Sequence, residues 1–210
     1  WAWGSSVRIP AIRPSIPDRV NKRTVQYLRA DDPENYLNWI IRNVEKMGSS
    51  HWLADRVDKG GLREFNAALE RLGIPHILRL RPSADNSNLD VWFEDRRSGV
   101  RVRPSGVGSG VAQVIPVVAA CEFRNDSTVL TIEQPELHLH PRMQANLGEY
   151  FVETSMGREA PLIVETHSEL LILRVLRMIR EGTADPSKVA VHYVGNTAEG
   201  PQISQMRIGS

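Results

Sequence analysis

The sequence predicts an α/β fold: a largely parallel sheet with flanking helices, preceded by a small segment of helix and strand. From residue 106 onward, short apolar runs alternate with helical patterns, which is typical of successive parallel α/β units. Two of these runs, 129–133 and 162–166, end in acidic, amide and imidazole side chains. Because open sheets of this class bind ligands beyond the carboxyl ends of their strands, we expect one polar cluster there.

Size and composition agree with a globular protein that can bury a core. The chain has 210 residues, 41% of them hydrophobic and 24% charged, with a net charge of +1. No apolar run reaches the roughly 20 residues that span a bilayer, and no basic-then-apolar signal segment opens the sequence. We therefore expect a cytoplasmic protein without a membrane partner. Cys121 is the only cysteine, so no disulfide can form within the chain, and we expect its side chain in the core.

The first part of the chain is expected to differ from the rest. Prolines punctuate residues 1–30, which favours an extended arm or linker over a helix or a central strand. Residues 31–82 are interpreted as a helical segment, in which Asp32 opens a helix that ends near Gly48. A second helix is expected at 62–72, because its apolar side chains share one face.

Residues 83–210 are assigned to one lobe, with an additional strand just before it. Short strands are expected at 76–81, 89–94 and 100–103, between turn signals. The alternating region predicts helices at 111–121, 142–153 and 169–181 and strands at 128–133 and 162–166. The last of these helices is apolar nearly all round, so we expect it to be buried. A hairpin of 189–194 and 202–208 closes the chain.

A turn rich in glycine and serine, Ser105–Gln113, leads directly into the helix expected at 111. Glycine lets backbone N–H groups approach a ligand, and a helix N-terminus adds partial positive charge, so such a turn suits a phosphate. A plain turn before a helix is the more common meaning of the pattern. Alone, the turn does not decide the function.

Side chains that can bind a metal or move a proton follow the two apolar runs. Glu133 lies at the tip of the first run, where nucleotide hydrolases hold Mg²⁺ through carboxylate oxygens and waters. Three further candidates follow it: Glu136, His138 and His140. They could suggest a transition-metal site, but a packed turn is the commoner arrangement. His167 follows the second run, and a satisfied core histidine is the alternative to a functional one.

Taken in order, the glycine–serine turn, the segment IEQPELHLHP and the segment IVETHSELL resemble the C-terminal half of an ABC-type ATPase domain. The resemblance is more specific to the soluble SMC-like and OLD-like ATPases of DNA repair and anti-phage defence. It covers about residues 74–210. It implies the C-terminal lobe of a P-loop ATPase head that binds ATP and Mg²⁺ and dimerises around them.

The resemblance implies roles in a dimer interface for two groups of residues. The turn VGSGVAQ stands where the family has its signature, with Gly108 in place of the family's serine. Its nucleotide contacts across the interface would come from Gly108, Ser109, Gly110 and Gln113. The D-loop would place His138 and His140 at the same interface.

The resemblance also implies the catalytic residues. Glu133 stands at the Walker B aspartate and would hold Mg²⁺, and His167 matches the switch histidine that senses the γ-phosphate. Gln134 stands at the catalytic glutamate. An amide can orient water but cannot accept its proton, so either Glu136 supplies the base or turnover is slow.

The phosphate-binding pattern GxxxxGK[ST] is absent from the sequence. The pattern needs a lysine directly after a glycine, and none of the four lysines has this position. They are Lys22, Lys46, Lys59 and Lys188. Since the Walker A loop contributes most of the triphosphate contacts, we expect the chain alone to bind ATP poorly. The resemblance implies a Walker A lobe from a further N-terminal segment or another polypeptide, a homodimer or higher oligomer, and DNA or a nuclease as further partners.

Two other functions stay open at this point. Because Gln134 replaces the catalytic glutamate, the chain can be a nucleotide-responsive interaction module with little or no turnover. A metal-dependent hydrolase is the third hypothesis, built on Glu133, Glu136, His138 and His140.

Overall fold

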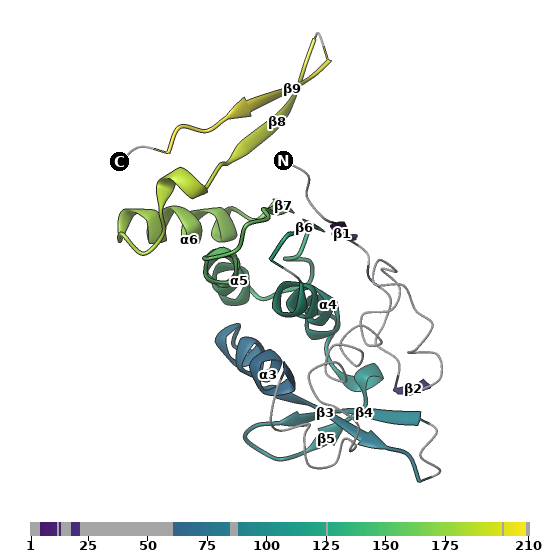
Figure 1. Ribbon diagram of the computed structural model, residues 1–210. Helices are drawn as coiled ribbons and strands as arrows, with labels where there is room; N and C mark the ends of the chain where they lie inside the picture. Colours follow the sequence, from purple (N-terminus) through teal and green to yellow (C-terminus); the bar gives the residue numbers. More distant parts are fainter. Residues whose placement is uncertain are drawn as a thin grey trace.

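A parallel sheet lies at the centre of the fold (Figure 1). The computed structural model describes residues 5–11, 13, 18–21, 61–84, 88–124, 126–198 and 200–208. The strands of the sheet, in spatial order, are β1 (Ser5–Ile9), β6 (Thr128–Glu133) and β7 (Leu162–Glu165). Both pairings are parallel, and the register places Arg8 beside Thr131 and Glu133 beside Glu165. The carboxyl ends of β6 and β7 therefore meet at one edge of the sheet.

The first strand corrects the interpretation of residues 1–30 as an arm or linker. All of β1 pairs with β6, and Ile9 is part of the buried core. The physical reason is that the prolines begin at Pro10, directly after β1, so they leave every amide of the strand free to join the ladder. The helix expected from Asp32 to near Gly48 lies outside the described residues.

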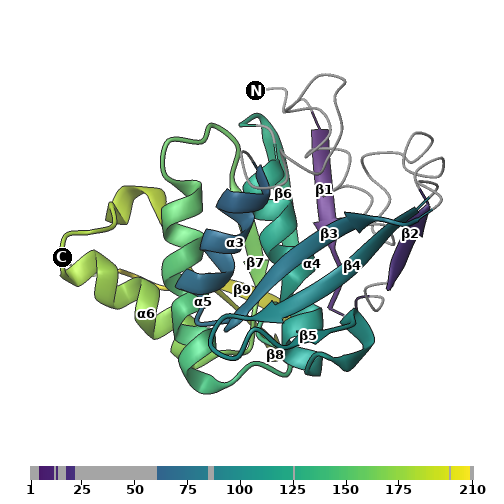
Figure 2. The same ribbon diagram turned by 90° about the horizontal axis from the view of Figure 1, so that it is seen from below.

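Four helices accompany the sheets in the described part of the chain. They are α3 (Gly61–Arg71), α4 (Ser109–Phe123), α5 (Pro141–Ser155) and α6 (Glu169–Arg180). Figures 1 and 2 show α4 and α5 on one face of the parallel sheet, and α3 between this layer and a second sheet. Every helix predicted in this part of the sequence is therefore present, and α4 begins two residues earlier than the expected 111.

The second sheet is antiparallel and lies beyond α3. Its strands are β2 (Arg19–Asn21), β4 (Asn88–Asp95) and β3 (His76–Pro82), with the short β5 (Arg101–Val102) paired to β4. The chain closes with the antiparallel hairpin of β8 (His192–Thr197) and β9 (Gly200–Gln205). The three short strands and the hairpin are confirmed, although both hairpin strands are displaced from the expected bounds.

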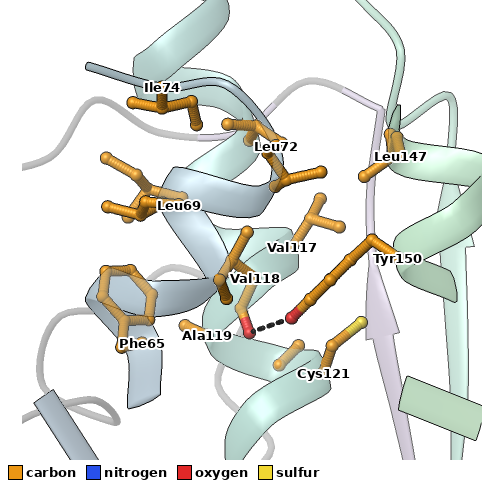
Figure 3. Close-up of a cluster of buried hydrophobic side chains, with 14 of the residues drawn as sticks. Phe65, Leu69, Leu72, Ile74, Val117, Val118, Ala119, Cys121, Leu147 and Tyr150 are labelled. Carbon is orange, nitrogen blue, oxygen red and sulfur yellow. Dashed lines mark hydrogen bonds between the residues drawn. The ribbon is translucent and has the colours of Figure 1, made fainter. Parts of the chain in front are cut away.

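Apolar side chains between α3, α4 and α5 form the core (Figure 3). Leu62, Phe65 and Leu69 line the inner face of α3, and Leu72 directly after the helix continues this face, as the helical spacing predicts. Tyr150 of α5 is 1% exposed, and its hydroxyl donates to Glu122 at 2.8 Å. Cys121 is fully buried in the same core, as expected.

The prediction that helix 169–181 is buried is wrong for most of its surface. Only Leu171 and Met178 of α6 are buried, whereas Leu173 is 58% exposed. The helix packs against α5 with one face, where Arg174 pairs with Glu149. Leu170 is 41% exposed as well, so the apolar composition exceeds what a single packing face can cover. Every helix among the described residues is too short or too polar to cross a bilayer.

Candidate functional site

The two acidic strand ends lie side by side at the carboxyl edge of the parallel sheet. Glu133 and Glu165 are register partners, and the Gln134 N–H donates to the Glu165 carbonyl at 2.8 Å. This bond carries the ladder one residue beyond β6. Gln134 has a φ of 42°, which is uncommon for a residue other than glycine, and the chain turns there. Glu133 is therefore the last residue of β6 and lies at the carboxyl edge of the sheet, which we call the rim.

A basic side chain from β1 accompanies Glu133. Burial alternates along β6, so Thr131 and Glu133 lie on the face of the sheet opposite Leu130 and Ile132, which are buried. The guanidinium of Arg8 hydrogen-bonds and pairs with the Glu133 carboxylate on that face. The Arg8 side chain is 72% exposed, so this ion pair is screened by solvent and contributes little to stability.

Glu136 connects the turn after β6 to the end of β7. The residue is 8% exposed, and its Oε1 accepts a hydrogen bond from the His167 backbone N–H at 2.7 Å. Its Oε2 is buried and has no hydrogen-bond partner among the described residues. Because the bond involves the backbone of His167, the exposed imidazole stays available for a ligand. The structure thus brings Glu133, Glu136 and His167 to one rim, as the sequence predicts.

A second connection holds the start of α6 against the same turn. Ser168 is the N-cap of α6, and its hydroxyl accepts from the Leu171 N–H while donating to the Gln144 side chain at 2.7 Å. The amide group of Gln144 in turn donates to the Leu139 carbonyl at 3.0 Å. This network fixes the backbone that follows His167.

The glycine–serine turn lies against the turn that follows β6. Gly108 is the N-cap of α4, and both Gly108 and Ser109 are exposed. A Cβ built on Gly110 would lie 2.5 Å from the His138 carbonyl oxygen, so the two backbones are in direct contact. His138 itself has a φ of 62° and an exposed side chain. The two predicted interface motifs are therefore neighbours within one chain.

His140 has a local structural contact. It is the N-cap of α5, and its Nδ1 accepts a hydrogen bond from the Arg142 N–H at 3.3 Å. Within the described ranges, no group of at least three histidine, cysteine or acidic side chains could hold a metal ion. The hydrolase hypothesis needs such a group from Glu133, Glu136, His138 and His140, so the geometry gives it no support. A single strand-end carboxylate, by contrast, fits Mg²⁺, which keeps several waters and takes few protein ligands.

Two arginines at this site were not expected from the sequence. Arg8 pairs with Glu133, and Arg13 donates from Nη2 to the Glu133 carbonyl at 2.7 Å. Both lie in the segment interpreted as a linker. The alternation in SSVRI was the signal for a strand, since Val7 and Ile9 share one face.

Together these features define an α/β domain with acidic and imidazole groups at the ends of adjacent parallel strands. Residues 8–174 match the model of the family described as "AAA domain, putative AbiEii toxin, Type IV TA system". The chain belongs to this family of AAA-type ATPase domains. No curated protein matches the sequence.

Several solved structures of SMC proteins have the same fold. One, from work on ATP-driven dimerisation and DNA-stimulated activation of SMC ATPases, has a TM-score of 0.54 at 14% identity and covers 73% of this chain and 87% of its own. The Smc head of Pyrococcus furiosus bound to the C-terminal domain of ScpA has a TM-score of 0.53 at 12% identity, covering 72% and 35%. An SmcHead bound to the C-winged helix domain of ScpA has a TM-score of 0.56 at 11% identity, covering 88% and 53%. The likeness establishes an ABC-type, SMC-like head fold.

Proposed function

We propose that the chain is part of an ATP-binding and ATP-hydrolysing head that dimerises around Mg²⁺ and ATP. One observation carries the proposal. The β6–β7 register and the Glu136 contact to the His167 backbone bring an acidic side chain and an exposed imidazole to a shared rim. An acidic strand end that can hold Mg²⁺, beside a group that can contact a phosphate, suits phosphoryl transfer, in which catalysis depends on positioning and on stabilising charge.

Each residue of the rim then has a separate task. Glu133 holds Mg²⁺, and this ion, when bound, neutralises charge on the phosphates. His167 contacts the γ-phosphate through its exposed ring. Gln134 orients the attacking water, and Glu136 accepts its proton through Oε2, the oxygen that has no partner in the described chain. Oε1 meanwhile stays bonded to the His167 backbone, which fixes the direction of the carboxylate.

The start of α4 supplies the contact to a second head. Gly108 and Ser109 are exposed, and they precede a helix of 15 residues whose N-terminus favours a negatively charged group. We place Ser109 and Gly110 on the γ-phosphate held by the facing subunit, with Gly108 beside them. The Gln113 side chain bonds the Arg13 backbone, so it supports this turn from within the same head. His138 and His140 lie at the same interface. Sedimentation with and without Mg·ATP measures the dimerisation.

ATP turnover needs a Walker A loop in addition to these residues. The 210-residue sequence lacks that pattern, so the loop comes from a further N-terminal segment or another polypeptide. The family description contains the words "putative AbiEii toxin, Type IV TA system", and one of the SMC structures comes from work on DNA-stimulated activation. On these grounds we propose a DNA-related or anti-phage task in the cytoplasm, with DNA or a nuclease as a partner.

A second candidate function rests on Gln134. Its amide cannot accept a proton, so the head can bind nucleotide and change its partners without rapid turnover. The carboxylate of Glu136 decides between the two functions, because Glu136→Gln keeps an oxygen for the His167 N–H but removes the base. If the first function holds, this variant loses turnover; if the second holds, the wild-type protein already lacks it.

The experiment measures ATP hydrolysis by the complete protein, with this chain and its Walker A loop together. Glu133→Ala and His167→Ala should each abolish turnover. The matched controls are Glu159→Ala and His192→Ala, which change exposed residues away from the rim and should leave it intact. Normal hydrolysis by either rim variant contradicts the assigned roles.

A further inference from the structure

Arg13 is a buried charged residue at the back of the proposed site. It is 3% exposed, and such burial of a guanidinium is costly unless hydrogen bonds compensate for the lost water. Its Nη2 donates to the Glu133 carbonyl at 2.7 Å and to the Gln134 carbonyl at 3.4 Å. These two carbonyls lie where β6 ends and the backbone turns with a positive φ at Gln134. The arginine therefore holds the backbone that carries the acidic residue and its neighbour.

The backbone of Arg13 is bound in turn by α4. The Arg13 N–H donates to Oε1 of Gln113 at 3.2 Å, and Nε2 of Gln113 donates to the Arg13 carbonyl at 3.0 Å. Both ends of the Gln113 amide are thus satisfied by one residue. Gln113 lies in the second turn of α4, three residues after Gly110. Arg13 consequently connects the start of α4, through its backbone, to the end of β6, through its guanidinium.

We propose that Arg13 is a positioning residue that fixes the strand end of Glu133 and Gln134 relative to the signature turn of the same head. This inference rests on the proposed function, because it assigns Arg13 a part in the turnover at that site. The guanidinium acts on the backbone and touches no substrate. Loss of the side chain should leave nucleotide binding largely intact while misplacing the groups that act on the attacking water. A misplacement of about 1 Å can cost on the order of 100-fold in rate.

A matched control is available at the other end of α4. Arg158 also donates to backbone carbonyls, those of Arg124 at 2.9 Å and Thr154 at 2.9 Å. Arg158→Ala should lower stability through lost hydrogen bonds without reaching the strand end. A comparison of the two alanine variants therefore separates a general loss of stability from a loss of positioning.

The test measures kcat and KM for ATP in the complete protein. Arg13→Ala should lower kcat about tenfold or more, with KM within about threefold of the wild type. Arg13→Lys, which keeps a charged donor, should recover part of kcat, and Arg158→Ala should keep the wild-type kcat. A kcat for Arg13→Ala no lower than that for Arg158→Ala overturns the inference. If Arg13→Ala does not fold, Arg13→Lys decides: a reduced kcat at unchanged KM supports it, and an unchanged kcat contradicts it.

Failure of the proposed function is recognised separately. Absence of Mg²⁺-dependent turnover in the wild type refutes the ATPase proposal. The effect of Arg13 on the backbone is then measured by amide hydrogen exchange. Arg13→Ala should accelerate exchange in 133–138, because it removes the donor to the Glu133 and Gln134 carbonyls. Exchange in 109–113 should change less, because alanine keeps the backbone groups that bond Gln113. Unchanged exchange in 133–138 contradicts the inference.

Discussion

Replacement of Gly110 by alanine tests the contact between the start of α4 and the turn after β6. The added Cβ would lie 2.5 Å from the His138 carbonyl oxygen, 3.1 Å from its carbonyl carbon and 3.3 Å from Cδ2 of Leu139. The two nearest atoms belong to the His138 backbone, so rotation of a side chain cannot relieve these contacts. Overpacking of this kind costs about 1–3 kcal/mol. For a protein of this size, each kcal/mol lowers Tm by roughly 2–4 °C.

Gly108 provides the matched control, two residues earlier on the same helix. A Cβ built on Gly108 has no neighbouring atom within 4 Å, so Gly108→Ala changes only the helix cap. Urea unfolding of the two variants measures the difference in the free energy of unfolding. We expect Gly110→Ala to be less stable than Gly108→Ala by at least about 1 kcal/mol. Equal stabilities would show that the His138 backbone is not packed against Gly110.

Three further predictions concern the core. Burial raises the pKa of the Cys121 thiol to about 12, so thiol reagents near pH 8 should label it only after unfolding. The pKa of this thiol is higher in the folded than in the unfolded protein, so the folded state is favoured fully below about pH 8 and progressively less as the pH rises toward 12. The free energy of unfolding, measured with urea, should therefore fall less at alkaline pH in Cys121→Ala than in the wild type. Tyr150→Phe removes the 2.8 Å hydrogen bond to Glu122 and should lower the free energy of unfolding, measured with urea, by about 0.5–1.5 kcal/mol. An unchanged free energy of unfolding would show that this bond does not stabilise the fold. Gly148→Ala places a Cβ 2.6 Å from the Leu171 carbonyl oxygen and should accelerate hydrogen exchange in α6; unchanged exchange contradicts the packing.

Local patterns were enough to predict most of the elements and the meeting of the two strand ends. The Ser168 cap and the alternation of apolar runs and helices depend on nearby residues, so the sequence displays them directly. The parallel pairing of β6 and β7 then followed from the class of fold, and it placed Glu133 beside Glu165, two residues before His167.

The contributions of β1 and Arg13 could not be predicted in the same way. The Arg13 contact to Glu133 spans 120 residues, and no local pattern records such a pairing. The prolines from Pro10 onward dominated the interpretation of this segment and concealed the short strand before them. The burial of α6 was overestimated because composition shows how many side chains are apolar, whereas packing on α5 covers one face. Long-range pairing and the extent of each packed face thus needed the structure.

The nucleotide affinity of the complete protein shows whether Glu133 and His167 bind the same Mg·ATP. Titration calorimetry with ATP and ADP, each with and without Mg²⁺, resolves their two roles. Glu133→Ala should lose the dependence of affinity on Mg²⁺, and His167→Ala should lose the preference for ATP over ADP. If Glu133→Ala keeps the full effect of Mg²⁺, or His167→Ala still distinguishes ATP from ADP as the wild type does, the shared site is contradicted.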